Sequence, residues 1–115
     1  MKTYIIVGVF IIFDIVTGLL SALKNSELNS TKLREGLYHK ISEILAVVGG
    51  HLLEYGTKYI NLGVNIPFFN TVCVYICITE LVSIIENLGK INPLLAKFFK
   101  PYIQKLSDRK DELDG

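Results

Sequence analysis

The sequence predicts an all-α membrane protein with three transmembrane helices, N-terminus outside and C-terminus inside, and a C-terminal cytoplasmic amphipathic helix. Half of the 115 residues are hydrophobic and the mean hydropathy is positive, which is unusual for a soluble domain. Three apolar stretches follow one another, and Lys and Arg gather on one side of them. We therefore expect a single membrane domain over residues 1–115, with spans at about 4–23, 41–60 and 66–88 and an amphipathic helix and charged tail at about 93–115.

The first predicted span contains one charge, Asp14. A helix over residues 4–23 is long enough to cross a hydrocarbon core of about 30 Å. Its thirteen Ile, Val, Leu and Phe residues favour insertion by roughly 4 to 8 kcal/mol, whereas a central Asp costs about 3 kcal/mol. A cleaved signal peptide is the competing interpretation, but the apolar region is too long and Leu20 stands where cleavage after Ala22 requires a small residue.

The second predicted span is the weakest. Over residues 41–60, eight strongly apolar residues are interrupted by Glu43, His51, Glu54 and Lys58. Insertion of the apolar residues is worth about 2 to 5 kcal/mol before two or three charges are subtracted. Alone, this segment would insert only marginally.

The third predicted span, over residues 66–88, is apolar through Ile78. Beyond that point it contains Glu80 and Glu86, so that its acidic residues lie toward one end.

The basic residues predict the orientation. Ten Lys and Arg residues lie between the first two spans or after the third, against Lys2 and Lys58 on the other side. Cytoplasmic loops carry the excess of Lys and Arg, which predicts the N-terminus outside and the C-terminus inside. The ten residues are Lys24, Lys32, Arg34, Lys40, Lys90, Lys97, Lys100, Lys105, Arg109 and Lys110.

Beyond Pro93, apolar residues recur at helical spacing among lysines. They are Leu94, Leu95, Phe98, Phe99, Tyr102, Ile103 and Leu106. This pattern is typical of an amphipathic helix lying on an anionic leaflet, and packing against a partner helix is the alternative. Pro101 predicts a kink, and the charged tail from Asp108 is expected to be solvated.

Each predicted span has one polar face and one apolar face. Because the polar faces cannot contact lipid cheaply, we expect them at a helix interface or on the wall of an aqueous lumen built from several copies. For Asp14, a hydrogen-bonded or protonated acid inside a single bundle is the alternative. The candidate pore-face or interface residues are Asp14, Thr17, Gly18, Ser21, Glu43, Gly50, His51, Glu54, Glu80, Ser83, Glu86 and Asn87.

Small residues recur at a spacing that lets helix backbones approach closely. Gly18 and Ala22 form one such pair, and Ser42, Ala46 and Gly50 form a second series. Ala22, Ser42 and Ala46 are therefore predicted helix-packing residues, either between copies or within one monomer.

No catalytic constellation is recognisable, and we expect neither an enzyme nor a cofactor. His51 and Glu54 offer too few ligands for zinc, so no metal site is predicted, and His39 is expected to be a loop or interface residue. Cys73 and Cys77 are interpreted as small apolar residues. The near-neutral net charge of +1 gives no indication of nucleic-acid binding.

Four fragments in order carry a resemblance to a known family: Asp14-x-x-Thr17-Gly18-x-x-Ser21-Ala22-x-Lys24, then Asn29-Ser30, then Glu35-Gly36-x-x-x-Lys40, and finally Glu80-x-x-Ser83-Ile84-x-Glu86-Asn87. Over residues 12–106 the chain resembles the bacteriophage holin family that includes toxin-release holins. One departure is the segment Gly89-Lys90-Ile91-Asn92-Pro93, which has one proline where the family often has G-x-P-x-P.

The resemblance implies a multi-pass protein of the bacterial cytoplasmic membrane that oligomerises into lesions. Its partners would be further copies of itself and the lipid bilayer. An endolysin or toxin would pass through as cargo without stable binding. An antiholin-type regulator and a small ion channel or membrane scaffold remain the alternative functions at this point.

Overall fold

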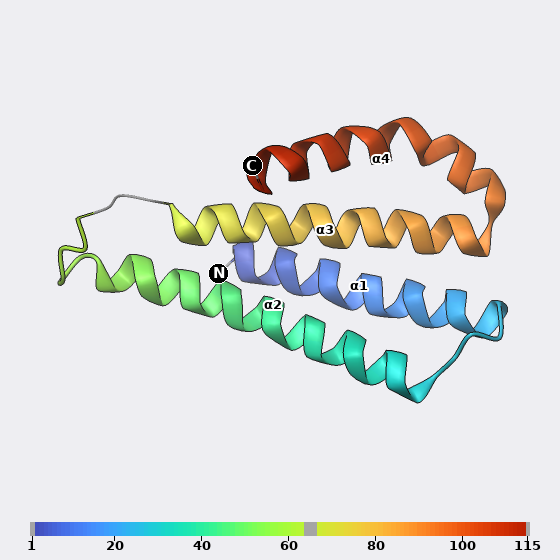
Figure 1. Cartoon of the computed structure of the whole chain (residues 1–115), viewed down its shortest axis with the longest axis horizontal. Helices are drawn as coiled ribbons and strands as arrows, with labels where there is room; N and C mark the ends of the chain where they lie inside the picture. The colour runs from blue at the N-terminus through green and yellow to red at the C-terminus, as the bar shows by residue number, and fades with distance from the viewer. Residues whose placement is uncertain (1, 64–66, 115) are drawn as a thin grey trace.

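The computed structural model describes residues 2–63 and 67–114, which form four α-helices (Figure 1). The helices are α1 (Lys2–Lys24), α2 (Ser30–Gly56), α3 (Phe68–Ile91) and α4 (Pro93–Asp114). Each helix runs opposite to the one before it. The predicted all-α class is confirmed, since the described residues contain no strand.

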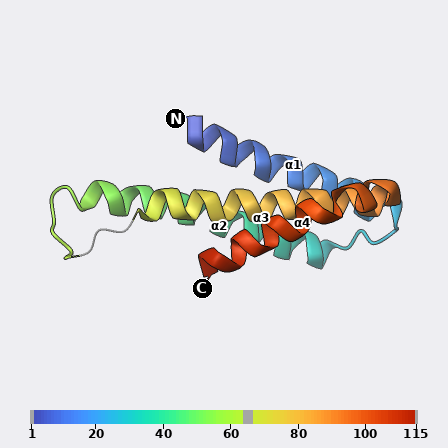
Figure 2. The ribbon, with the colours of Figure 1, turned by 90° about the horizontal axis from the view of Figure 1, so that it is seen from above.

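α3 is the central helix and packs against α1, α2 and α4 (Figure 2). α1 and α3 run in the same direction (Figures 1 and 2). A chain that crosses a membrane along both of these helices must therefore return between them, and α2 is the segment that connects them.

A small apolar core holds α1, α2 and α3 together at one end of the bundle. Val7 and Ile11 of α1, Val47 of α2, and Cys73 and Ile76 of α3 are each at most 4% exposed. The interpretation of Cys73 as a small buried residue is confirmed.

Outside this core the distribution of side chains is inverted relative to a soluble protein. Large apolar side chains cover the outer surface of α1 and α2, whereas several of the buried side chains are polar or charged. Such an extended exposed apolar surface indicates contact with lipid or other protein. The exposed residues include Ile5, Ile6, Val9, Ile12, Phe13, Val16, Leu20 and Leu23 on α1, and Ile41, Ile44, Leu45, Val48 and Leu52 on α2.

Two of the three predicted spans are supported. Among the described residues, α1 and α3 are long and apolar enough to cross a membrane, and α2 is too polar to be counted with them. α1 includes the whole predicted segment 4–23. α3 ends at Ile91 rather than 88, and residue 66, the predicted start of the third span, lies outside the described residues.

α2 begins at Ser30, well before the predicted start at residue 41. The cause is an N-cap at Asn29, whose side-chain oxygen accepts hydrogen bonds from the N–H groups of Thr31 at 2.8 Å and Lys32 at 3.4 Å. Hydropathy marks where a helix becomes apolar and not where it begins. Lys32, which was expected between the first two spans, therefore belongs to the helix, and Lys40 lies well inside it rather than at its start.

α4 packs along α3, as the partner-helix alternative proposed. Leu95, Phe99, Ile103 and Leu106 are half-buried on one side of it. The helix contains Pro101 and curves along its length (Figure 1). The helix continues to Asp114, so the charged segment from Asp108 is part of α4, and Asp108, Arg109, Asp111 and Glu112 in it are exposed, while residue 115 lies outside the described part.

The turn between α3 and α4 is a single residue, Asn92. Its backbone N–H donates to Leu88 O at 2.8 Å, and its side-chain oxygen accepts from Leu94 N at 3.2 Å. A Cβ on Gly89 would lie 2.9 Å from the Cβ of Ala96. Glycine at position 89 therefore permits the close approach of the two helices.

Candidate functional site

Lys40 connects three helices at the centre of the bundle. Its Nζ donates hydrogen bonds to Asp14 Oδ2 of α1 and to Glu80 Oε2 of α3. The same Nζ lies 3.7 Å from Oε1 of Glu43, one turn further along α2. The side chains of Lys40, Asp14 and Glu80 are 12%, 8% and 1% exposed, so this is a buried ion-pair network.

Asn87 attaches the polar face of α1 to α3. Its Nδ2 donates to Asp14 Oδ1 at 3.1 Å and to Thr17 Oγ1 at 3.2 Å. Thr17 Oγ1 in turn donates to Phe13 O at 3.0 Å, within its own helix. A Cβ on Gly18 would be 3.5 Å from Asn87 Nδ2. The polar stripe predicted on α1 is therefore packed against α3 within one copy.

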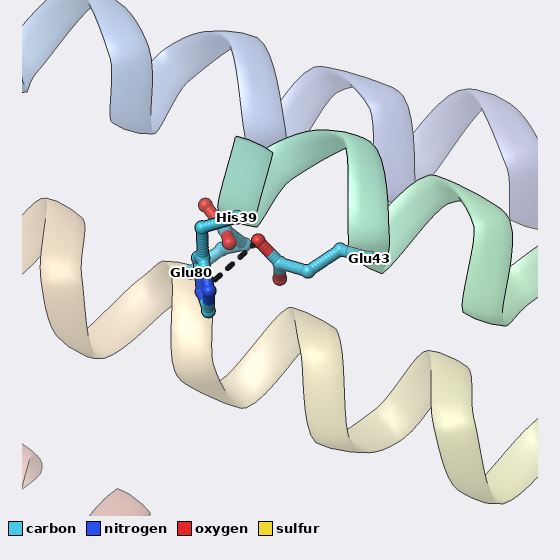
Figure 3. A group of neighbouring side chains, drawn as sticks. All are labelled: His39, Glu43 and Glu80. Atoms are coloured by element: carbon cyan, nitrogen blue, oxygen red, sulfur yellow. Dashed lines mark ion pairs between the residues drawn. The ribbon is translucent and has the colours of Figure 1, made fainter. Parts of the chain in front are cut away.

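The residues Asp14, His39, Lys40, Glu43 and Glu80 form what we call the central charge cluster. It holds three carboxylates and one ammonium group, with His39 Nε2 3.4 Å from Glu43 Oε1 (Figure 3). Glu43 Oε1 and Glu80 Oε1 are buried and have no hydrogen-bond partner among the described residues. The cluster thus offers more acceptors and negative charge than donors and positive charge.

The central charge cluster lies near mid-length in each of its helices. Asp14 is close to the midpoint of α1, Glu43 to that of α2, and Glu80 to that of α3. If α1 and α3 cross the bilayer, these charges lie near its middle. Ionisable groups at that depth face a bundle interior or a water-filled cavity and commonly mark functional sites.

Two grooves reach the cluster. One of about 420 Å³ separates α1 from the first half of α2, with Asp14, Gly18, Lys40, Ser83 and Asn87 in its lining. The other, of about 430 Å³, is lined by residues of the cluster that include His39 and Glu80. Lys40 therefore lines both grooves, and α2 is separated from α1 over part of its length.

The remaining predicted residues of α2 lie away from the cluster, beside Phe69. The His51 ring centroid is 5.3 Å from that of Phe69, and Glu54 Oε1 accepts a hydrogen bond from Phe69 N at 3.2 Å. A Cβ on Gly50 would lie 3.3 Å from Phe69 Cα. These three residues position the start of α3 against α2.

The other predicted residues are divided between the interior and the surface. Ser21 is buried and Ala22 half-buried, whereas Ser42, Ala46 and Glu86 are exposed. Packing of the small residues between copies, and the assignment of a pore face, stay predictions.

The sequence interpretation missed the roles of Lys40 and His39. Lys40 was counted among the cations between the first two spans and was placed on one face of the second helix with Glu43, but its pairing with Asp14 and Glu80 was not predicted, although Asp14 in an apolar helix needs a counterion. His39 precedes Glu43 by four residues, which places both on one side of a helix. Recognising the N-cap at Asn29 would have placed His39 inside α2.

An apolar exterior around a buried charge cluster, with two helices able to cross a bilayer, defines a helical membrane protein with its polar groups gathered inside. The family model described as the bacteriophage holin family matches residues 1–108, and the chain belongs to this family. The resemblance inferred from the sequence is thereby confirmed. The family consists of non-enzymatic membrane proteins with a role in phage lysis. No curated protein and no solved structure matches the chain.

Proposed function

We propose that this chain is a holin that oligomerises in the bacterial cytoplasmic membrane and forms a lesion for an endolysin or toxin, which passes without stable binding. One observation carries the proposal beyond family membership. A single copy has an apolar outer surface and buries the central charge cluster, whose ionisable side chains would otherwise be hydrated. Such a molecule fits a bilayer as a monomer and has polar faces available for a lumen after rearrangement.

The proposed topology has three spans, with the N-terminus outside and the C-terminus inside. The parallel direction of α1 and α3 supports a returning span along α2. The charges of α2 raise the cost of insertion, but Lys40 and Glu43 face the other helices and Lys40 is paired with Asp14 and Glu80. Pairing inside a bundle lowers the cost of charges at membrane depth.

A labelling experiment tests this orientation. In a variant with Cys73→Ala and Cys77→Ala, a single cysteine is introduced as Lys2→Cys or as Glu112→Cys. The chain is expressed below the density at which lesions form, which retention of a cytoplasmic protein verifies. A membrane-impermeant maleimide applied to intact spheroplasts should then label the first position only, and the second after lysis. Labelling of both positions in intact spheroplasts would refute the proposed topology.

We further propose that α4 leaves α3 at Asn92 when the protein is embedded, and lies on the cytoplasmic leaflet. α4 carries Lys97, Lys100 and Lys105 on exposed positions, and these cannot accompany α3 through hydrocarbon cheaply. Exposed Leu94 and Phe98 beside them suit the boundary between headgroups and acyl chains.

The proposed conversion occurs above a threshold density of monomers. α2 is the element that rearranges, because it is the least apolar of the three spans and a groove already separates it from α1. The polar faces then contact water, and the small residues of α1 and α2 support contacts between copies. Loss of the membrane potential can favour the change, since one charge moved across the field is worth about 2.3 kcal/mol per 100 mV.

Induction of the chain in a bacterium tests the function. Dye entry, efflux of a cytoplasmic protein and membrane potential are followed together. Passage of large solutes supports the holin, and leakage of ions alone indicates a channel. A chain that is harmless alone but delays a second holin is an antiholin-type regulator, and one without any effect is a scaffold.

Asp14→Leu tests the assigned polar face in the same assay. The variant should delay killing because it places an apolar side chain where the lumen wall needs a polar one. Membrane insertion should persist, since removing a central Asp favours insertion by about 3 kcal/mol. Asp111→Leu, on an exposed position of α4, is the matched control. Equal lysis times for the two variants would contradict the assignment of Asp14.

A further inference from the structure

We propose that His39, Glu43 and Glu80 bind one divalent transition-metal ion of the zinc type, and that this ion links α2 to α3. The site is independent of lesion formation and would exist in the single copy. It was not expected from the sequence, where His39 was interpreted as a loop or interface residue.

The three side chains converge from two helices (Figure 3). One ligand atom from each lies within 4.8 Å of the others, and His39 Nε2 is 3.4 Å from Glu43 Oε1. Nitrogen and oxygen ligands bind zinc at about 2.0 to 2.2 Å, which places them about 3.3 Å from each other in a tetrahedral site. His39 and Glu43 already have this separation, and a side-chain rotation of Glu80 completes it.

The buried oxygens without partners provide the independent observation. Glu80 is fully buried and Glu43 is 7% exposed, and Oε1 of each lacks a hydrogen-bond partner among the described residues. Lys40 pairs with Asp14 and with the other oxygen of Glu80. Glu43 Oε1 has only the long contacts to His39 Nε2 at 3.4 Å and Lys40 Nζ at 3.7 Å, neither of which is a hydrogen bond. A buried carboxylate oxygen without a hydrogen bond is costly, so both oxygens are suited to accept a cation.

The charge of the cluster points in the same direction. With all four groups ionised, the carboxylates of Asp14, Glu43 and Glu80 share the single ammonium of Lys40, which gives the buried cluster a net charge of two negative charges. Buried charges persist when they are paired or coordinate a metal. A divalent cation neutralises the remaining two charges in a single binding event.

The donor set selects the class of metal. One imidazole nitrogen with two carboxylates suits zinc and neighbouring transition metals, whereas calcium takes six to eight oxygen ligands. Three protein ligands leave a position for water, as in open zinc sites. His39 is exposed and lines the groove of about 430 Å³ that also reaches Glu80, which gives the ion a path of entry.

Zinc binding by the purified full chain tests the inference. The untagged protein in detergent micelles competes for Zn²⁺ with a chromophoric chelator, and Co²⁺ absorption reports the ligand geometry. We expect one Zn²⁺ per chain, and His39→Gln should weaken binding at least about tenfold, the lower limit for disturbing a metal site. His51→Gln, on an exposed position of the same helix, should leave the affinity unchanged.

Glu80→Gln is the second variant and should also weaken binding, with circular dichroism confirming that it is folded. Glu80 is buried, so its substitution can disturb folding. His39 is exposed, so the result for His39→Gln is not subject to this complication. Absence of binding at millimolar Zn²⁺ would overturn the inference. So would equal affinity of His39→Gln and the unsubstituted chain, or loss of binding in His51→Gln, which would place the ion on His51 and Glu54.

Discussion

Replacing Lys40 with methionine should strongly destabilise the bundle. The substitution keeps an unbranched side chain, one atom shorter, and removes two charge-assisted hydrogen bonds, to Asp14 and Glu80. Such bonds contribute roughly 1.5 to 3 kcal/mol each, and removing one partner of a buried ion pair costs about 3 to 5 kcal/mol. We expect the free energy of unfolding to fall by about 3 to 5 kcal/mol, which corresponds to a hundredfold to several thousandfold change in the unfolding equilibrium, at roughly tenfold per 1.4 kcal/mol.

The measurement is an SDS titration in mixed micelles, with helix content followed by circular dichroism. Lys32→Met is the matched control, because Lys32 lies on the same helix and is exposed. A variant that combines Lys40→Met with Asp14→Asn, Glu43→Gln and Glu80→Gln should recover much of the loss, since it leaves no uncompensated buried charge in the cluster. A loss for Lys40→Met equal to that of Lys32→Met would refute the bridging role.

Three further substitutions test local packing and capping. Gly50→Ala places a Cβ 3.3 Å from the Phe69 backbone, whereas the Cβ of Gly49→Ala meets nothing within 4 Å. In the same titration, Gly49→Ala should stabilise the protein by up to about 1 kcal/mol. The Gly50→Ala variant should be about 1 to 3 kcal/mol less stable than the Gly49→Ala variant. Asn29→Ala should cost about 1 kcal/mol and increase amide exchange in the first turn of α2, because the N-cap hydrogen bonds are lost. Gly89→Ala brings a Cβ to 2.9 Å from the first turn of α4 and disturbs the packing of α4 on α3. Because α4 is proposed to leave α3 in a membrane, amide exchange in α4 should be unchanged in micelles, and an increase throughout α4 would show that the two helices stay packed there.

The sequence was sufficient to predict the class of fold and the two stronger spans. The apolar length and the single charge of residues 4–23 predicted α1, because a helix of this length with so few polar residues is typical of a membrane span. The start of α2 was not predicted, since residues 30–40 are polar and only the cap at Asn29 marks the beginning of the helix. Capping is a local hydrogen-bond property that hydropathy does not measure.

The polar faces were predicted by helical periodicity, but their partners were not. Periodicity placed Asp14, Thr17 and Gly18 on one side of α1, and the structure packs that side against α3. Which helix supplies the counterion depends on the register between α1, α2 and α3, which is a tertiary property. From the sequence, the counterion of Asp14 could therefore be limited to basic residues on the polar faces of the other helices. The sequence could not identify Lys40 among them.

The self-sufficiency of one copy changes how the acid in the first span is explained. On the sequence alone, we expected the polar faces to need neighbouring copies, whereas the structure satisfies Asp14 internally through Lys40 and Asn87. Sheltering of Asp14 therefore does not require oligomerisation. Assembly, in the proposed function, is driven instead by the density of monomers and by contacts of small residues on exposed positions of α2 such as Ser42 and Ala46.

The energetics of the central charge cluster favour a second state. A buried ion pair is often no more stable than apolar residues of similar volume, so stability alone gives no reason to place Asp14, Lys40 and Glu80 at mid-length in three helices. A protein that must both rest in lipid and later line water has such a reason. The three side chains satisfy one another in the closed copy, and in the proposed conversion water replaces these ion pairs once α2 moves away. Such an exchange would bring the two proposed states close in free energy, which is the condition for a change controlled by density and membrane potential.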